Sequence, residues 1–102
     1  MIVIYRGTTH TIEVELPFEI KYLAEAYVSI SQNEEVVLDK KLSECSCDGN
    51  VLTVKFSQEE TLSLDCRCKA EMQIRAKSLE GDAFATDPIR VHVGRILKDG
   101  VI

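Results

Sequence analysis

The amino-acid sequence predicts a single all-β domain, an antiparallel β-sandwich of about seven to eight strands. Apolar residues recur at every second position, for example in Ile12–Leu16 near the start and in Ile89–Val93 near the end. This alternation places side chains on opposite faces of a strand, so one face is buried and the other is exposed. Turn-forming residues separate the alternating segments at intervals of roughly 8 to 12 residues, which is typical of a sandwich.

Length and composition favour one independently folding domain without a nucleic-acid partner. The chain has 102 residues, of which 45% are hydrophobic and 28% charged, as in ordinary globular domains. Its net charge of −5 repels phosphate backbones and anionic lipid surfaces. With 6% aromatic residues and no Trp, it also lacks the means to stack sugars or bases.

The N-terminus does not have the pattern of a secretory signal peptide. Met1–Arg6 lacks both a basic start and a long apolar stretch, and no segment approaches the ~20 apolar residues of a membrane span. We therefore expect the chain to be cytoplasmic when synthesised and to have no membrane partner.

The first quarter of the chain predicts two strands and an ambiguous segment. A strand over Ile2–Tyr5 ends at the turn-like Arg6–Thr9, and a second strand covers Thr11–Leu16. Pro17 ends that strand because proline cannot donate a ladder hydrogen bond. The segment Phe18–Glu25 has partly helical spacing but is too short to assign by period.

The middle of the chain predicts a hairpin, a loop and a further strand. Alternation over Ala26–Lys40, interrupted by the turn residues Gln32–Glu34, indicates two antiparallel strands. Leu42–Asn50 is loop-like, and Val51–Phe56 alternates again. We expect a short helical turn near Ser57–Leu62, because Ser57 and Glu60 have the spacing of a capping box.

The last third predicts one long strand and a broken one. The long strand runs from Ala70 through Lys77 and ends before the turn Glu80–Asp82. Ala83–Ala85 continues the pattern, Asp87-Pro88 interrupts it, and Ile89–Ile96 forms the last strand. The inward members of all these segments are expected in one core. They are Ile12, Val14, Leu16, Val28, Ile30, Leu52, Val54, Phe56, Met72, Ile74, Val91 and Val93.

Two Cys-x-Cys pairs, Cys45/Cys47 and Cys66/Cys68, are the main candidates for chemistry. Structural zinc sites normally use Cys-x-x-Cys, and cysteines two apart on a strand stand about 6 to 7 Å from each other. The favoured interpretation makes Cys66 and Cys68 small core residues and Cys45 and Cys47 loop thiols. Disulfides between the pairs and a zinc site are the alternatives.

No other residues suggest catalysis. His10 and His92, the only histidines, lie in no recognisable nucleophile or metal motif and are expected at the surface. The acidic pairs Glu34-Glu35 and Glu59-Glu60 fall at a turn and at a helix start, where solvation and the helix dipole account for them. We therefore expect no enzymatic activity, no catalytic residues, no cofactor and no small-molecule substrate.

Several segments, in this order along the chain, resemble a phage protein family. They are Tyr5–Thr9, Leu16–Phe18, Val28–Gln32, Phe56–Thr61 and Arg95–Ile102. The chain resembles small tail-associated proteins of phages and prophages in Gram-positive gut bacteria and, more distantly, the N-terminal β-sandwich domain of phage baseplate upper proteins. This resemblance implies an immunoglobulin-like sandwich that docks other tail or baseplate subunits, or itself, and is incorporated into a virion. A metal-binding or redox-responsive thiol protein is the alternative.

Both ends of the chain are candidates for contacts with a partner. Ile2, Val3 and Ile4 form a short apolar first strand with little protection by charge, and the segment Leu97–Ile102 ends in the apolar Val101 and Ile102. An unprotected sheet edge can dock another chain. The alternative is that both ends pack on their own sandwich or fray.

Overall fold

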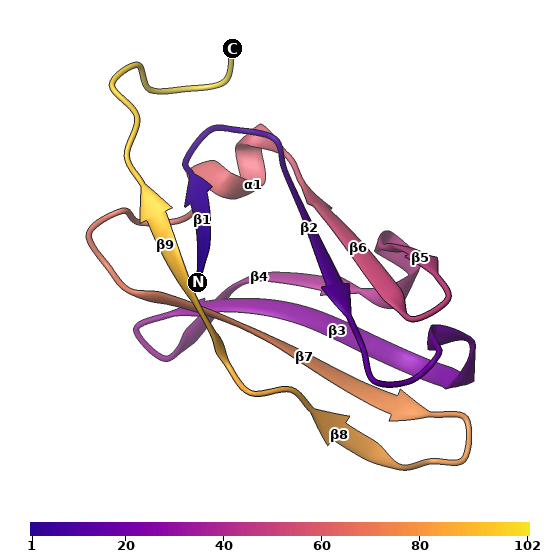
Figure 1. Ribbon diagram of the computed structural model, residues 1–102. Helices are drawn as coiled ribbons and strands as arrows, with labels where there is room; N and C mark the ends of the chain where they lie inside the picture. Colours follow the sequence, from indigo (N-terminus) through magenta and orange to yellow (C-terminus); the bar gives the residue numbers. More distant parts are fainter.

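Two β-sheets face each other in the computed structural model, which describes residues 1–102 (Figure 1). The strands are β1 (Ile2–Tyr5), β2 (His10–Glu15), β3 (Leu23–Gln32), β4 (Glu35–Lys41), β5 (Ser46–Asp48), β6 (Val51–Phe56), β7 (Ala70–Ser78), β8 (Ala83–Ala85) and β9 (Ile89–Gly94). The helical segments are the 3-10 turns η1 (Ile20–Tyr22) and η2 (Leu42–Glu44) and the helix α1 (Gln58–Leu62).

The strand order is that of an immunoglobulin-like sandwich. The smaller sheet has the order β2-β6-β5, which matches strands B, E and D of an immunoglobulin domain. The larger sheet has the order β1-β9-β7-β3-β4, in which β9, β7, β3 and β4 match G, F, C and C′ of the variable type. The fold class expected from the sequence is therefore confirmed.

Two details of the sheets differ from the expectation. There are nine strands, because the segment assigned to a loop contains β5, whose residues are all exposed and so show no alternation. The sandwich is also not wholly antiparallel, since β1 pairs with β9 in parallel, with Ile4 opposite Val93. Alternation indicates which side chains are buried, but it does not specify the direction of the neighbouring strand.

The predicted hairpin is formed by β3 and β4. Its turn residues Asn33 and Glu34 have φ angles of 53° and 65°, and Gln32 pairs with Glu35 on either side of them. Two consecutive positive φ angles are characteristic of the tight turn that matches the twist of paired strands.

The two sheets enclose one apolar core. The predicted core residues are all buried except Val14, which is half-buried. Val14 lies on β2, an edge strand with no neighbour on its outer side, so its side chain is less covered than Leu52 opposite it on β6. The core also contains Ile20, from the segment that the sequence left ambiguous, and Leu64, from the connection after α1.

The expected capping box begins α1. The Ser57 hydroxyl accepts a hydrogen bond from the Glu60 backbone N–H at 3.2 Å, and the Glu60 carboxylate accepts one from the Ser57 N–H at 2.9 Å. These bonds satisfy two donors that a helix start leaves free. Lys40 of β4 adds an ion pair to Glu60 at 2.8 Å, so α1 is fixed to the edge of the larger sheet.

Thr86 ties the interruption before the last strand, Asp87-Pro88, to β7 by two hydrogen bonds. Its backbone N–H donates to the Ile74 carbonyl at 2.9 Å, and its hydroxyl accepts from the Ile74 N–H at 3.1 Å. The side chain thus replaces a backbone carbonyl in the ladder just before Asp87-Pro88, where the chain leaves β7. As a result β8 and β9 pair with different parts of β7.

We expect Ile74→Ala to lower the free energy of unfolding by about 2 to 5 kcal/mol, because it removes buried methyl groups and leaves a cavity. Ile74 is 2% exposed and lies at the centre of β7. Urea denaturation followed by circular dichroism measures the change. A loss below about 0.5 kcal/mol would contradict the assigned burial of this strand face.

Candidate functional site

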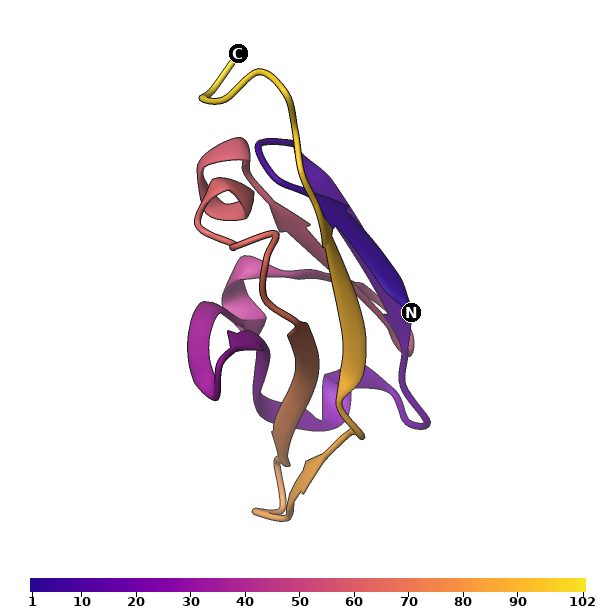
Figure 2. The same ribbon diagram turned by 90° about the vertical axis from the view of Figure 1, so that its left-hand side faces the viewer.

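The segment after β9, residues Arg95–Ile102, is here called the C-terminal arm. Figures 1 and 2 both show it extending past α1 at one end of the sandwich. Leu97 and Ile102 are 93% and 88% exposed, and Val101 is 56% exposed. The arm therefore presents three of its large apolar side chains to solvent, while Ile96 is half-buried.

Polar contacts nevertheless hold the backbone of the arm in place. The Gln58 side-chain amide donates to the Ile102 carbonyl at 3.1 Å and accepts from the Ile102 N–H at 2.9 Å. Nearer β9, Asp99 lies 3.7 Å from the Arg6 guanidinium. The expected alternative is that this end packs on its own sandwich or frays, and these contacts join the arm to its own sandwich.

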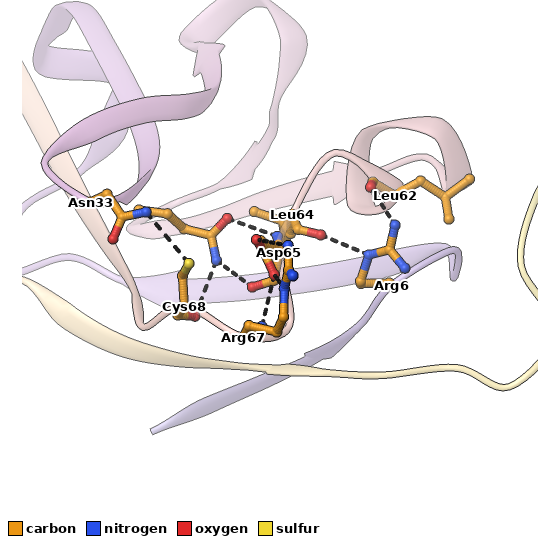
Figure 3. A network of polar contacts seen from close by, with 8 residues as sticks. Arg6, Asn33, Leu62, Leu64, Asp65, Arg67 and Cys68 are labelled. Carbon is orange, nitrogen blue, oxygen red and sulfur yellow. Dashed lines mark hydrogen bonds and ion pairs between the residues drawn. The ribbon is translucent and has the colours of Figure 1, made fainter.

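Arg6 links three parts of this end of the molecule (Figure 3). Its side chain donates to the Leu64 carbonyl at 2.7 Å and to the Leu62 carbonyl at 3.0 Å. The last carbonyls of a helix have no partner within the helix, so a guanidinium with several donors suits this position. Arg6 thus joins the turn after β1, the end of α1 and the C-terminal arm.

The first strand is only partly available to a partner. Val3 is 39% exposed and Ile2 is half-buried, but Ile4 is fully buried within the core. The inclusion of Ile4 among the contact residues is therefore wrong, because parallel pairing with β9 directs its side chain into the sandwich beside Val93. The outer edge of β1 has no neighbouring strand.

The cysteines do not lie where the favoured interpretation placed them. Cys66 is exposed and Cys68 half-buried, and both precede β7 in a connection instead of lying on the strand. The expectation that these two are core residues is wrong. Cys45 is half-buried against the core after η2, Cys47 is exposed on β5, and all four thiols are free.

Gln32 explains why the connection before β7 leaves the core. Its buried side chain donates to the Asp65 carbonyl at 2.7 Å and the Cys68 carbonyl at 3.2 Å, and it accepts from the Asp65 N–H at 2.9 Å. A buried amide requires such partners, so the connection curves around Gln32. Asn33 also donates to the Cys68 sulfur at 3.4 Å (Figure 3). The sequence did not indicate this role, because Gln32 falls where a turn residue is expected.

Four side chains near these features have shifted pKa values, and in one of them, Arg67, the hydrogen bond to Asp65 raises the pKa. Burial, together with the neighbouring Glu44, raises the pKa of Cys45, which keeps that thiol protonated at neutral pH. Burial alone would raise the pKa of Glu60, but hydrogen bonds from Lys40 and Ser57 outweigh it and lower the pKa. Hydrogen bonds from Arg67 lower the pKa of Asp65 to about 2.

The remaining candidates form no cluster. His92 is exposed on β9 and His10 is half-buried at the start of β2, so only His92 is fully at the surface as expected. No three His, Cys, Asp or Glu residues are grouped in a way that could hold a metal ion. None of the helical segments is long and apolar enough to cross a membrane.

Comparison with solved structures finds similarity in fold. A strand-swapped dimer of the mouse leukocyte-associated immunoglobulin-like receptor 1 domain aligns with a TM-score of 0.49 and 9% identity, over 90% of this chain and 85% of that chain. The V domain of amphioxus IgVJ-C2 aligns with a TM-score of 0.39 and 9% identity, over 91% of this chain and 99% of that one. No family model and no curated protein matches the chain.

We expect replacement of Cys45 by Ala and of the other three cysteines by Ser to preserve the fold. None of the four side chains belongs to the fully buried core, so the free energy of unfolding should fall by at most about 2 kcal/mol. Urea denaturation of both proteins, with zinc analysis of each preparation, measures this. An unfolded variant would instead indicate a fold that depends on bound metal.

Acid is expected to destabilise the protein partly through Asp65. Its carboxyl has a pKa of about 2 in the folded chain against an ordinary 3.8, which applies to the unfolded chain. Its contribution to the free energy of unfolding is therefore complete above pH 3.8 and is lost as the pH falls from about 3.8 toward 2. Asp65→Asn should flatten the fall in melting temperature over that range. Asp48→Asn, at an exposed position on β5, is the matched control and should leave the acid profile unchanged.

Proposed function

We propose that this chain is a non-enzymatic structural or assembly module of a phage or prophage, acting through protein–protein contacts in a tail or baseplate. The observation that carries the proposal is the C-terminal arm: Gln58 bonds to the Ile102 backbone and Arg6 pairs with the Asp99 carboxylate, while the Leu97 and Ile102 side chains remain exposed. Large apolar side chains that are fixed in position and unburied are typical of a surface that another protein covers.

The arm is suited to docking because it is already ordered. A partner that binds a positioned segment loses less conformational entropy than one that binds a disordered end. The exposed edge of β1 lies on the larger sheet beside β9, the strand that leads into the arm, and Val3 on it is also exposed. Val3 and the arm together provide apolar contacts, and the resemblance to phage tail proteins supplies the class of partner.

The proposal gives every other feature a structural role. The ion pairs of Glu60 with Lys40 and of Asp65 with Arg67 fix helix and loop ends, and the protein's net negative charge disfavours DNA. In this proposal the chain is made in the cytoplasm and is incorporated into the virion by contact with neighbouring tail or baseplate subunits.

Truncation after Lys98 tests the role of the arm. We expect the truncated chain to keep its melting temperature within a few degrees, because no core residue is lost, and to lose co-purification with phage tail and baseplate proteins. Size-exclusion chromatography with light scattering measures the complexes.

Val36→Ser in the full chain is the matched control for this experiment. Val36 is a large exposed apolar residue on β4, at the other edge of the larger sheet. We expect this variant to retain the partners. If the truncated chain binds the same phage proteins as the full chain, residues 99–102 have no docking role and the proposal loses the support of Ile102.

A further inference from the structure

Leu16–Phe18 and β8 line an apolar groove. Figure 1 shows β8 at the end of the sandwich opposite the C-terminal arm. Leu16, Pro17 and Phe18 form one wall, between β2 and η1, and Phe84 and Ala85 of β8 form the other. The rings of Phe18 and Phe84 meet edge to face with their centroids 4.7 Å apart. With a volume of about 560 Å³, the groove falls within the usual range for binding pockets.

Strand edges flank this groove. β2 is the outermost strand of the smaller sheet, and β8 pairs only with β7. The backbone groups on the outer sides of both strands have no strand partner. Free edges of this kind accept an extended segment by main-chain hydrogen bonding, while pockets between them take its side chains.

The charges around the groove favour a basic occupant. Asp87 lines the groove, Glu15 precedes Leu16, and Glu80 and Asp82 line the adjoining hollow that shares Phe84. The one lysine of the η1 wall, Lys21, is already paired with Glu19 at 3.1 Å. An extended segment carrying apolar side chains and positive charge therefore complements this end of the molecule.

The C-terminal arm carries side chains of both kinds, on a backbone that bends at Leu97, Lys98 and Gly100. Leu97, Val101 and Ile102 are its exposed apolar residues, and Arg95 and Lys98 are its cations. Its one acidic side chain, Asp99, is already close to Arg6 of the same chain. The apolar side chains of the arm therefore suit the apolar lining of the groove, and its cations suit the acidic residues around it.

The arm cannot fill the groove of its own chain. The molecule extends 47 Å along its longest axis, and β8, which lines the groove, lies at the opposite end from the arm in Figure 1. Residues Arg95–Ile102 span at most ~26 Å at about 3.3 Å per residue, and Gln58 holds Ile102 near α1. The occupant must come from another molecule.

We propose that the apolar groove binds the C-terminal arm of a second copy of this chain. This inference rests on the proposed function, since it identifies a partner for the same arm. Because the two contacting surfaces differ, the association generates a ring or an open filament, or a twofold dimer in which two copies exchange arms.

Mixing two variants tests the head-to-tail arrangement. Phe84→Glu charges the groove and leaves the arm intact, whereas the double variant Leu97→Glu, Ile102→Glu charges the arm and leaves the groove intact. We expect the average mass of the unchanged chain to rise with concentration in light scattering, and each variant alone to self-associate at least tenfold more weakly. An equimolar mixture should form a 1:1 dimer that grows no further, because it contains one intact contact.

Two further variants distinguish a loss of association from a loss of the fold. Val36→Glu places the same charge on the exposed edge of β4 and should associate like the unchanged chain. Asp87→Lys reverses a charge on the rim of the groove without entering the core and should also weaken association at least tenfold. Melting temperatures show that each variant is folded.

Three results would overturn the inference: an unchanged chain that stays monomeric, an arm variant that associates normally, or a mixture that contains only monomers. Because these measurements use the purified chain alone, they separate this inference from the proposed function. A monomeric chain that still captures phage proteins through its arm would refute self-assembly only. An assembling chain that captures none would refute the role in a phage tail only.

Discussion

The rest of the structure depends on the packing of the two sheets against each other. Their inner faces form one buried apolar cluster, which includes Ile12 of β2, Phe56 of β6 and Met72 of β7. No disulfide joins the sheets, since all four thiols are free, and the chain has no Trp. The sandwich is therefore held by close packing, in which each buried side chain contributes on the order of 1.5 to 3 kcal/mol. This packing allows the connections at both ends to be shaped by polar contacts.

Those polar contacts shape one end in particular. Gln32 holds the connection before β7, Arg6 satisfies the carbonyls at the end of α1, and Gln58 positions the tip of the C-terminal arm. Each of these side chains bonds to backbone atoms distant in sequence, so each fixes a chain segment relative to the core. The consequence is an ordered arm whose apolar side chains are available to another protein.

The opposite end has a different character. The break at Thr86 separates β8 from β9, β2 has no outer neighbour, and the rings of Phe18 and Phe84 meet edge to face. The two ends of the sandwich therefore differ, since one carries the apolar arm and the other the apolar groove. In the proposed self-assembly, this difference between the two ends lets copies of the chain join in series.

The sequence by itself determined the sandwich, because alternation at every second residue in Ile12–Leu16 or Val51–Phe56 depends only on which face of a strand is buried. It also determined the start of α1, since a capping box is a contact between residues three apart. Only the tertiary structure decided the burial of Ile4, the exposure of Cys66, the role of Gln32 and the position of the arm. Each of these depends on a neighbour distant in the chain, such as Val93 for Ile4, Asp65 for Gln32 or Gln58 for Ile102, and local patterns carry no information about such partners.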